Sequence, residues 1–415
     1  MKKQIKKRRD LRILWNTNAL NSYSGYGVEA KDILFRLIKD GWPIAVSAFW
    51  GLQGGPSHFI YPEDENPKLQ GLKILQYPML TDPHGSDGIY YHALDYHADV
   101  VFSMQDIWTL NPEFLSKMRY WIPYFPVDKE PLPTNVLDKL RYAYKSITFS
   151  QFGHDLLEKS GFVSDLILEG TDTEIFKPMD KEKARQELGI KSGLFLFAMV
   201  AANKENPPRK GFQEALTAFK MFHDKHPDSG IIFSIQQQGP TGFPIREYAH
   251  YLGIDSQLAF IADYTAMFKP SSPMINKLFN AADVLLHPSQ TEGFGLTIIE
   301  AAAAGTPAIV ARGQSMPELV IEGKTGFIAD VLYKRFTADL SFVNVVDPKS
   351  IYEQMEKSFD LVTKNENKVT TDCRNWIKSK FDIDKIVEEK WIPYYESLQS
   401  EILPLKGKDS SIKFS

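Results

Sequence analysis

The chain has 415 residues, of which 43% are hydrophobic and 24% are charged, and its formal net charge is −4. This length and composition suit two globular domains, each with its own core, and exclude a largely disordered chain. The charge balance lacks the basic footprint of a dedicated nucleic-acid binder, and the single cysteine, Cys373, excludes an intramolecular disulfide.

The N-terminal segment, residues 1–9, is basic and reads MKKQIKKRR. It lacks the apolar stretch of a secretory signal, and the sequence has no run of about eighteen apolar residues that could span a membrane. We interpret the segment as a solvated tail, with contact to anionic lipid or nucleic acid as the alternative. A cytoplasmic location is expected, which Cys373 fits as a residue of a reducing compartment.

The first predicted unit is a strand at residues 11–15, a loop at 24–27 and an amphipathic helix at 28–39. The spacing Gly25-x-Gly27-x-x-Ala30 is typical of a Rossmann-like phosphate turn. An NAD site is disfavoured, because the next predicted strand, residues 44–49, ends without the acidic residue that contacts a ribose hydroxyl. We prefer the interpretation that Gly25, Tyr26 and Gly27 form a glycine loop that projects into a cleft from the other domain and approaches the phosphate of a bound ligand.

A polar loop with two adjacent cations follows a predicted buried strand at residues 193–202. The loop runs from Asn203 and Lys204 to Arg209 and Lys210, just before a predicted helix. Fixed cations at such a point could stabilise the negative charge that develops on a leaving nucleoside diphosphate. The alternative is a solvated helix start, which the helix dipole disfavours for cations.

Two carboxylates, Glu292 and Glu300, stand eight positions apart around a glycine-rich turn. Residues 283–288 are predicted to form a buried strand, and a helix is predicted from Leu296 until Gly305. The turn from Gly293 to Thr297 (GFGLT) can therefore hold a diphosphate on backbone N–H groups at a helix N-terminus. Glu300 can accept hydrogen bonds from a ribose diol, and Glu292 can reach sugar hydroxyls. The alternative is an ordinary solvated helix start.

This stretch resembles the glutamate-x7-glutamate motif of the retaining family 4, or group 1, glycosyltransferases. The resemblance continues through Gly305-Thr-Pro-Ala-Ile-Val310, Pro317-Glu318-Leu-Val320 and Gly323-Lys-Thr-Gly326-Phe and covers most of the second half. It implies that Glu292 contacts the donor sugar, Glu300 the ribose, and Gly293, Phe294, Gly295, Leu296 and Thr297 the phosphates. Lys210 matches the second cation of the family's pair, while Arg209, Lys204 or Asn203 stands for the first.

One departure concerns the first domain, where many family members carry a histidine at the end of a strand. Here Gln105 and Asp106 follow the predicted strand at residues 98–102, so either could contact the sugar or the acceptor hydroxyl. His154 follows another predicted strand and is a further candidate. The aromatic residues suited to stacking on a sugar or a base suit a packed domain equally; they are Tyr23, Tyr26, Phe49, Trp50 and Trp108.

Strands alternate with helices along the chain, which implies parallel sheets with helices on both faces. By resemblance to the GT-B fold, residues 1–170 form a Rossmann-like acceptor-side domain and 171–380 a Rossmann-like nucleotide-sugar domain. Residues 381–400 then form a helix that packs back on the first domain, and 401–415 a disordered tail. Asp382-Ile-Asp384 lies between predicted helices and is interpreted as a helix cap, so no metal site is expected.

The sequence thus predicts a metal-independent, cofactor-free retaining glycosyltransferase that moves a sugar from a UDP- or GDP-linked donor to a hydroxyl acceptor. The acceptor stays open: a glycan, a lipid, a small metabolite or a modified DNA base. Two other classes also stay open. A nucleotide-sugar epimerase or hydrolase of related fold would consume the donor without transfer, and a non-catalytic nucleotide-sugar binding protein would only bind it.

Overall fold

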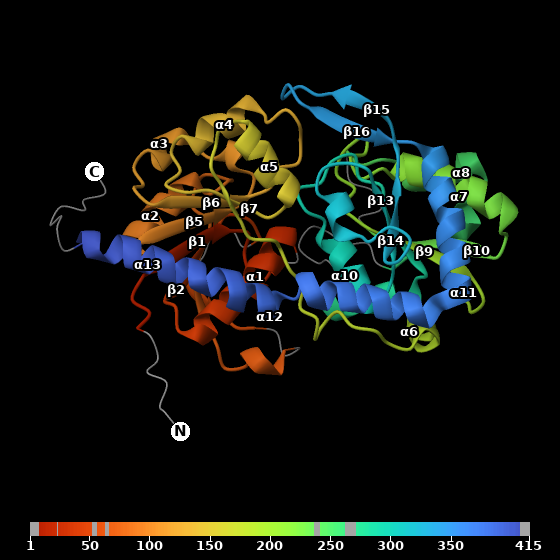
Figure 1. Ribbon diagram of the computed structural model, residues 1–415, viewed down its shortest axis with the longest axis horizontal. Coiled ribbons are helices and arrows are strands. Elements are labelled where there is room, and N and C mark those ends of the chain that lie inside the picture. The colour runs from red at the N-terminus through yellow and green to blue at the C-terminus, as the bar shows by residue number, and fades with distance from the viewer. Residues whose placement is uncertain are drawn as a thin grey trace.

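The computed structural model describes residues 8–22, 24–51, 56–62, 66–235, 241–261 and 271–406. Two α/β units, each built on its own sheet, lie beside each other, and the C-terminal helices run along both (Figure 1). Most of the predicted basic tail, residues 1–7, and the aromatic candidate Tyr23 lie outside the described residues.

The first sheet has eight strands in the order β3-β4-β2-β1-β5-β6-β7-β8, and only the edge strand β3 is antiparallel to its neighbour. The central strands β1, β5 and β6 are buried at every position, as expected of a parallel sheet covered by helices on both faces. The strands are β1 (Ile13–Thr17), β2 (Ile44–Ala48), β3 (His58–Ile60), β4 (Ile74–Tyr77), β5 (Val100–Met104), β6 (Trp121–Phe125), β7 (Ile147–Thr148) and β8 (Asp165–Leu166). The helices are α1 (Gly25–Asp40), η1 (Pro67–Leu69), α2 (Ser86–Tyr96), η2 (Ile107–Thr109), α3 (Pro112–Leu115), α4 (Thr134–Leu140) and α5 (Gln151–Lys159).

The second sheet has six parallel strands in the order β11-β10-β9-β12-β13-β14. Its strands are β9 (Phe195–Val200), β10 (Ser229–Ser234), β11 (Leu258–Phe260), β12 (Val284–His287), β13 (Ala308–Ala311) and β14 (Gly326–Ala329). The helices of this unit are α6 (Lys181–Glu187), α7 (Phe212–Lys225), α8 (Ile245–Leu252), η3 (Asp255–Gln257), α9 (Ser272–Ala281), α10 (Leu296–Ala304) and η4 (Met316–Leu319). The two sheets lie on either side of residue 170, the predicted domain boundary.

The predicted strands that precede the candidate site are present within about two residues of their expected ends, and α10 occupies the predicted helix. One of the predictions for these elements is wrong. Residues 25–27 form the first turn of α1 and not a loop, because Ser24 caps the helix by accepting a hydrogen bond from the Gly27 N–H at 3.1 Å.

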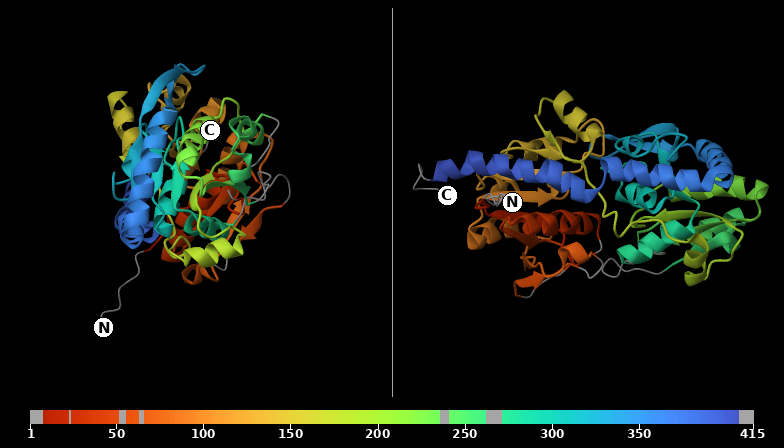
Figure 2. Two further views of the ribbon diagram at one scale, coloured as in Figure 1. Left: turned by 90° about the vertical axis from the view of Figure 1, so that its right-hand side faces the viewer. Right: turned by 60° about the horizontal axis from the view of Figure 1, so that its bottom comes forward.

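The C-terminal helices cross from the second domain back to the first, as predicted (Figures 1 and 2). They are α11 (Pro348–Lys380), α12 (Ile383–Ile386), the π-helical turn η5 (Val387–Trp391) and α13 (Ile392–Lys406). On the first domain, the Trp15 indole N–H donates to the Tyr395 hydroxyl at 2.7 Å, and the Trp15 and Trp391 rings lie 5.4 Å apart. Residues 401–406 are helical where the sequence predicted a tail, and 407–415 lie outside the described residues.

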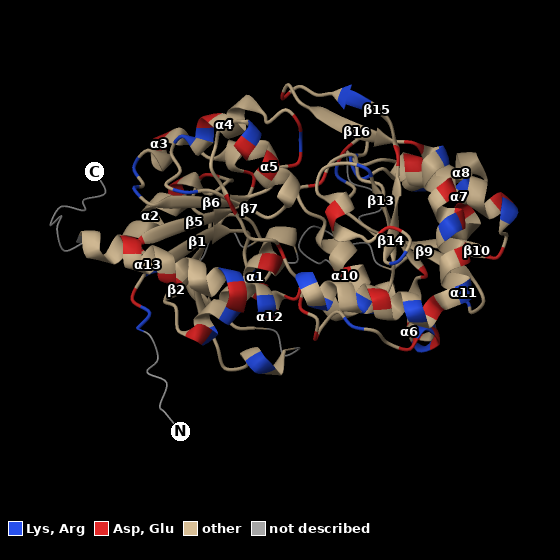
Figure 3. Ribbon diagram, viewed as in Figure 1, with Lys and Arg blue, Asp and Glu red and all other residues tan. Residues whose placement is uncertain are grey.

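Charged groups hold the C-terminal segment in place where it crosses to the first domain. Asp382 accepts hydrogen bonds from the backbone N–H groups of Asp384 and Lys385, which confirms the predicted helix cap. Arg36 on α1 contacts Asp172 at 2.7 Å and Asp384 at 2.5 Å. Helix α11 carries exposed ion pairs, and Figure 3 shows charges of both signs interspersed along it.

A two-stranded hairpin that the sequence analysis did not predict follows the second sheet. It consists of β15 (Val331–Phe336) and β16 (Phe342–Val346). The hairpin reaches the first domain, where the Phe342 N–H donates to the Glu130 carbonyl at 3.0 Å and Lys129 pairs with Asp339 at 2.5 Å. Within the described residues, no helix combines the length and apolar character needed to cross a membrane.

Candidate active site

A cleft of about 400 Å³ lies between the two domains. Its walls come from residues at the carboxyl ends of strands in both sheets, among them Asn18 after β1, Asp106 after β5, Ala201 after β9 and His287 at the end of β12. In each sheet the strand order reverses between two of these strands, β1 and β5 in the first and β9 and β12 in the second. Open parallel sheets bind ligands at such switch points, and here the two switch points contribute to one cleft.

The second-domain wall contains both predicted cations, Arg209 and Lys210, beside Glu292. The Lys210 ammonium lies 2.6 Å from a Glu292 carboxylate oxygen, and the Arg209 guanidinium lies 3.7 Å from the same oxygen. Burial opposes ionisation of Glu292, but Lys210, His287 and Arg209 outweigh it and hold the pKa of this carboxyl well below its usual value. Glu292 is therefore ionised at neutral pH and offers a fixed hydrogen-bond acceptor to the cleft.

Backbone contacts hold the two charged loops together. The Gln290 N–H donates to the Arg209 carbonyl at 2.7 Å, and an Arg209 side-chain N–H donates to the Thr291 carbonyl at 2.9 Å. Gly211 has a φ of +68° and packs so closely against Pro288 that a Cβ atom would collide with its carbonyl. Glycine is thus required there, and its absence of a side chain lets the Lys210 loop approach β12.

His287 completes this wall and was not among the predicted site residues. Its Nδ1 lies 3.1 Å from the Thr297 hydroxyl, and its Nε2 lies 3.4 Å from Glu292. Burial lowers the pKa of His287, so the ring is neutral at pH 7 and can orient Glu292 through a hydrogen bond. The sequence did carry one signal for this residue, because His287 lies at the carboxyl end of a predicted strand.

The predicted phosphate turn also faces the cleft. Gly293, Phe294, Gly295, Leu296, Thr297 and Glu300 all line it. Gly295 is the N-cap of α10 and, as a glycine, has no side chain to cap the first-turn N–H groups, which suits an anion at this helix end. Glu300 lies about one turn into the helix, on the same face as Leu296 and Thr297.

The first-domain wall starts from the N-terminus of α1. Ser24, Gly25 and Tyr26 line the cleft, together with Trp50, Asp106 and Glu169. Tyr26 makes a side-chain hydrogen bond to Asp106. Burial, followed by the nearby Asp128 carboxylate, raises the pKa of Asp106 to about 6. Glu169 is 4% exposed, and burial raises its pKa well above the usual value, which favours its neutral form.

Several predicted residues are not brought into the cleft. Gln105 is buried and donates to Asn16, Asn203 exchanges hydrogen bonds with the backbone of Phe243 at 2.8 Å, and the His154 ring contacts the Ser164 hydroxyl at 2.9 Å. Each side chain has a local partner that a sequence cannot show. Of the aromatic candidates, Tyr26 and Trp50 line the cleft, Phe49 is buried and Trp108 is exposed elsewhere. Gly27 packs behind the first turn of α1 against Ser22.

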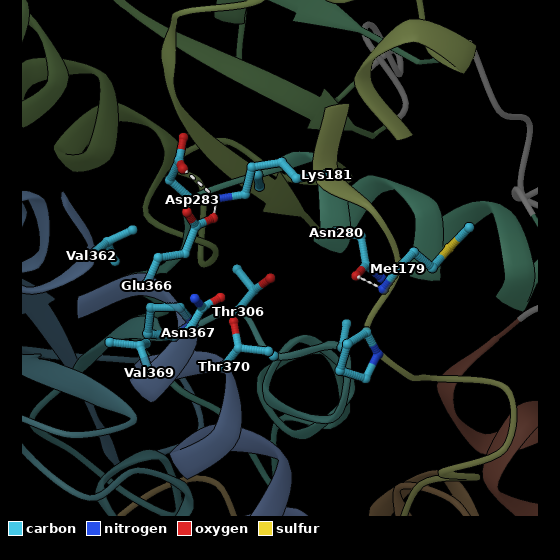
Figure 4. A pocket seen from close by; sticks show the side chains of 15 residues that line it. Met179, Lys181, Asn280, Asp283, Thr306, Val362, Glu366, Asn367, Val369 and Thr370 are labelled. Atoms are coloured by element: carbon cyan, nitrogen blue, oxygen red, sulfur yellow. Dashed lines mark hydrogen bonds and ion pairs between the residues drawn. The ribbon is translucent and has the colours of Figure 1, made fainter. Parts of the chain in front are cut away.

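A second pocket lies on the far side of the second domain, between α9, α10 and α11 (Figure 4). Its charged groups pair with one another: Lys181 bonds Asp283 at 2.7 Å and also pairs with Glu366. The charged groups of this pocket thus bond to one another, and we interpret the pocket as structural. Among the residues that the structure describes, no cluster of three metal-ligating side chains is present.

Solved structures share this architecture across nearly the whole chain. A sucrose-phosphate synthase from Thermosynechococcus elongatus superposes with a TM-score of 0.72 at 15% identity, covering 94% of this chain and 100% of that one. Anabaena Alr3699/HepE, solved in complex with UDP-glucose, has a TM-score of 0.67 at 17% identity with the same coverage. The chain has the GT-B fold. The predicted fold class is therefore confirmed.

Sequence similarity is concentrated in part of the chain. Residues 180–334 match the family model described as glycosyl transferases group 1. A D-inositol 3-phosphate glycosyltransferase from Corynebacterium glutamicum (strain R) is 33% identical over 168 residues, which is 39% of this chain and 38% of that protein. The protein of the same name from Acidothermus cellulolyticus is 30% identical over 163 residues, 39% of this chain and 36% of its own length. The chain thus matches a little over a third of each relative.

Proposed function

We propose that this GT-B protein is a retaining glycosyltransferase that moves a sugar from a UDP- or GDP-linked donor to a hydroxyl group. The observation that supports this proposal most directly is that Lys210, Glu292 and the N-terminus of α10 all line one interdomain cleft. The match of residues 180–334 to group 1 glycosyl transferases and the shared GT-B fold support the same activity.

Each donor group has a candidate partner. The first-turn N–H groups of α10 and the cations Arg209 and Lys210 bind the diphosphate, Glu300 binds the ribose, and Glu292 binds sugar hydroxyls. Lys204 contributes from the rim of the cleft. The predicted contacts of Gln105, Asn203 and His154 are left out of this assignment because their side chains bond elsewhere.

In the proposed mechanism the cations stabilise the negative charge that develops on the departing diphosphate as the glycosidic bond breaks. The departing phosphate accepts the proton of the attacking hydroxyl on the same face of the sugar, so the configuration is retained. The protein orients both substrates and needs no covalent nucleophile. The contact of HepE with UDP-glucose makes UDP-glucose the first donor to test.

Donor identity is tested by thermal shift with UDP- and GDP-sugars, because a ligand at about a hundred times its dissociation constant adds about 2.7 kcal/mol of stability. We expect a shift from one nucleotide sugar and its nucleoside diphosphate. No shift from any of them would contradict the proposal. Donor consumption without sugar transfer would indicate an epimerase or hydrolase, and binding without consumption a non-catalytic binding protein.

Metal independence is a separate expectation, based on the cations Arg209 and Lys210 beside the phosphate turn. These groups can neutralise the diphosphate in place of a divalent ion. Transfer should persist in excess EDTA at the rate seen with magnesium. Loss of transfer in EDTA that magnesium or manganese restores would contradict this part of the proposal.

A further inference from the structure

The two walls of the cleft carry different charges. Among the described residues that line it, every lysine and arginine comes from the second domain: Lys204, Arg209 and Lys210. The first-domain wall contributes the accessible Asp106 and the buried Glu169, together with Tyr26 and Trp50. Burial raises the pKa of Glu169 and favours its neutral form, so Asp106 supplies the negative charge of this wall. The second-domain wall holds two acids, Glu292 and Glu300, against its three cations. A donor diphosphate fits the second-domain wall, so the first-domain wall remains for the acceptor.

The acidic character of the first-domain wall centres on Asp106. This side chain is accessible from the cleft although protein surrounds it on most sides, and it accepts a hydrogen bond from Tyr26. Asp128 lies close enough to raise its pKa, and a Thr291 hydroxyl bonds the Asp128 carboxylate at 3.1 Å. At neutral pH the wall therefore holds a carboxylate where an acceptor hydroxyl would approach.

The cations of the opposite wall already have partners. An acceptor anion would have to compete with these partners for the cations. Lys210 pairs with Glu292 at 2.6 Å, and Arg209 contacts both Glu205 at 3.3 Å and the Thr291 carbonyl at 2.9 Å. Lys204 stands at the rim, 5.8 Å from the Trp50 ring. The Asp106 carboxylate alone would disfavour a second anion by about a hundredfold at 5 to 6 Å and an effective dielectric of about 20. Arg209 and Lys129, which also act on Asp106, offset part of this repulsion, and Asp128 adds to it.

We infer that the acceptor is a neutral polyol at the end that enters the cleft and that phosphorylated acceptors are rejected there. This inference rests on the proposed function and specifies its substrate class. Asp106 accepts hydrogen bonds from the acceptor hydroxyls, and the Tyr26 and Trp50 rings offer faces to the sugar C–H groups. The names of the relatives contain a phosphorylated compound, inositol 3-phosphate. The similarity to the Corynebacterium glutamicum protein covers only 39% of this chain, so it does not assign that acceptor to this protein.

The test uses the full-length protein with radiolabelled UDP-glucose and GDP-mannose as donors. Small-molecule and lipid extracts are separated by anion exchange into neutral and anionic fractions, and each fraction is offered as acceptor. We expect label in the neutral fraction, or in the anionic fraction on a hydroxyl of a neutral polyol end. Label only on hydroxyls next to a phosphate or carboxylate would overturn the inference. Label in neither fraction, with donor binding intact in calorimetry, contradicts glycosyl transfer itself, so the two failures are distinguishable.

A variant test follows on the acceptor that is found. The ratio of kcat/KM for the neutral compound to kcat/KM for its phosphate ester should be at least about ten in the wild-type protein. Asp106→Asn should lower this ratio by about tenfold. The matched control is Asp138→Asn on α4, an exposed acid paired with Arg141, which should leave the ratio unchanged. UDP affinity by calorimetry verifies that each variant keeps its donor site. An unchanged ratio in a folded Asp106→Asn variant would overturn the role of this wall.

Discussion

Lys210 and Glu292 are the residues on which the proposed chemistry depends most. They come from loops 82 positions apart in the sequence, yet their charged groups meet at 2.6 Å because both loops follow neighbouring strands, β9 and β12. A cation fixed by such a contact loses little further entropy when charge develops on a leaving group, which is the condition for strong transition-state stabilisation.

Lys210→Ala should lower kcat by about a hundred- to a thousandfold, with a smaller change in donor affinity, because the cation stabilises charge present mainly in the transition state. Steady-state kinetics at saturating donor measures the effect. Lys220→Ala, on the solvated face of α7, is the matched control and should leave kcat unchanged. A rise in donor KM alone, with kcat intact, would make Lys210 a binding residue and move the leaving-group role to Arg209.

Glu300→Gln should weaken donor binding by about 1.5–3 kcal/mol, the range for hydrogen bonds to a charged group. The reason is the loss of the carboxylate proposed to accept both ribose hydroxyls. Calorimetry with the nucleoside diphosphate measures the change, and the exposed Glu322→Gln serves as control. Unchanged affinity in a folded variant would remove the ribose assignment.

At the residue scale, the charged loops that line the cleft could be picked out from the sequence, but several of the residues that surround them could not. Glu292 and Glu300 stand in a motif with local spacing, and Lys210 ends a polar loop that follows a predicted strand, so all three could be found without a structure. Asp128 and Glu169 come near the site only through strand order and the way the two domains face each other. His287 stands at the end of a predicted strand and was overlooked. Gln105 and Asn203 looked equally polar in sequence, but buried partners satisfy them.

Among the elements, α1 and α12 show how the crossing of the C-terminal segment is held. Arg36 is 7% exposed, and burial opposes its charge, but Asp32, Asp172 and Asp384 outweigh this and raise its pKa. Asp172 is 1% exposed and also accepts a hydrogen bond from Asn66. Removal of the arginine would leave a buried carboxylate without its cation.

Arg36→Met should therefore lower the free energy of unfolding by about 3–5 kcal/mol, the cost of breaking a buried ion pair. Urea denaturation followed by tryptophan fluorescence suits this region because Trp15 and Trp391 lie nearby in the core. Arg141→Met, which breaks an exposed pair on α4, should change it by less than about 1 kcal/mol. An equal free energy of unfolding in the two variants would show that the ion pairs of Arg36 do not stabilise the fold.

The elements that could be predicted are those with simple local patterns. The buried strands β9 and β12 and the alanine-rich α10 follow directly from apolar runs and a closing glycine. The start of α1 was misplaced because Ser24 and two glycines are as typical of a loop as of a capped helix. The β15–β16 hairpin was missed because its anchor, the pairing of Phe342 with Glu130, comes from the other domain.

At the scale of the whole molecule, the two sheets direct the carboxyl ends of their central strands into one cleft, and the C-terminal helices hold this arrangement from outside. The order of strands and helices made a two-domain parallel fold predictable, and the resemblance to GT-B enzymes predicted that the domains face each other. The charge difference between the walls was not predictable, because it depends on which loops meet.

The central claim is that this cleft transfers a sugar from a nucleotide diphosphate donor with retention. The most direct measurement counts the nucleoside diphosphate released and the sugar incorporated in the same reaction and determines the anomeric configuration of the product by NMR. The account predicts one sugar incorporated for each nucleoside diphosphate released, with the configuration of the donor kept. Release of nucleoside diphosphate without incorporation, or a product of inverted configuration, would contradict it.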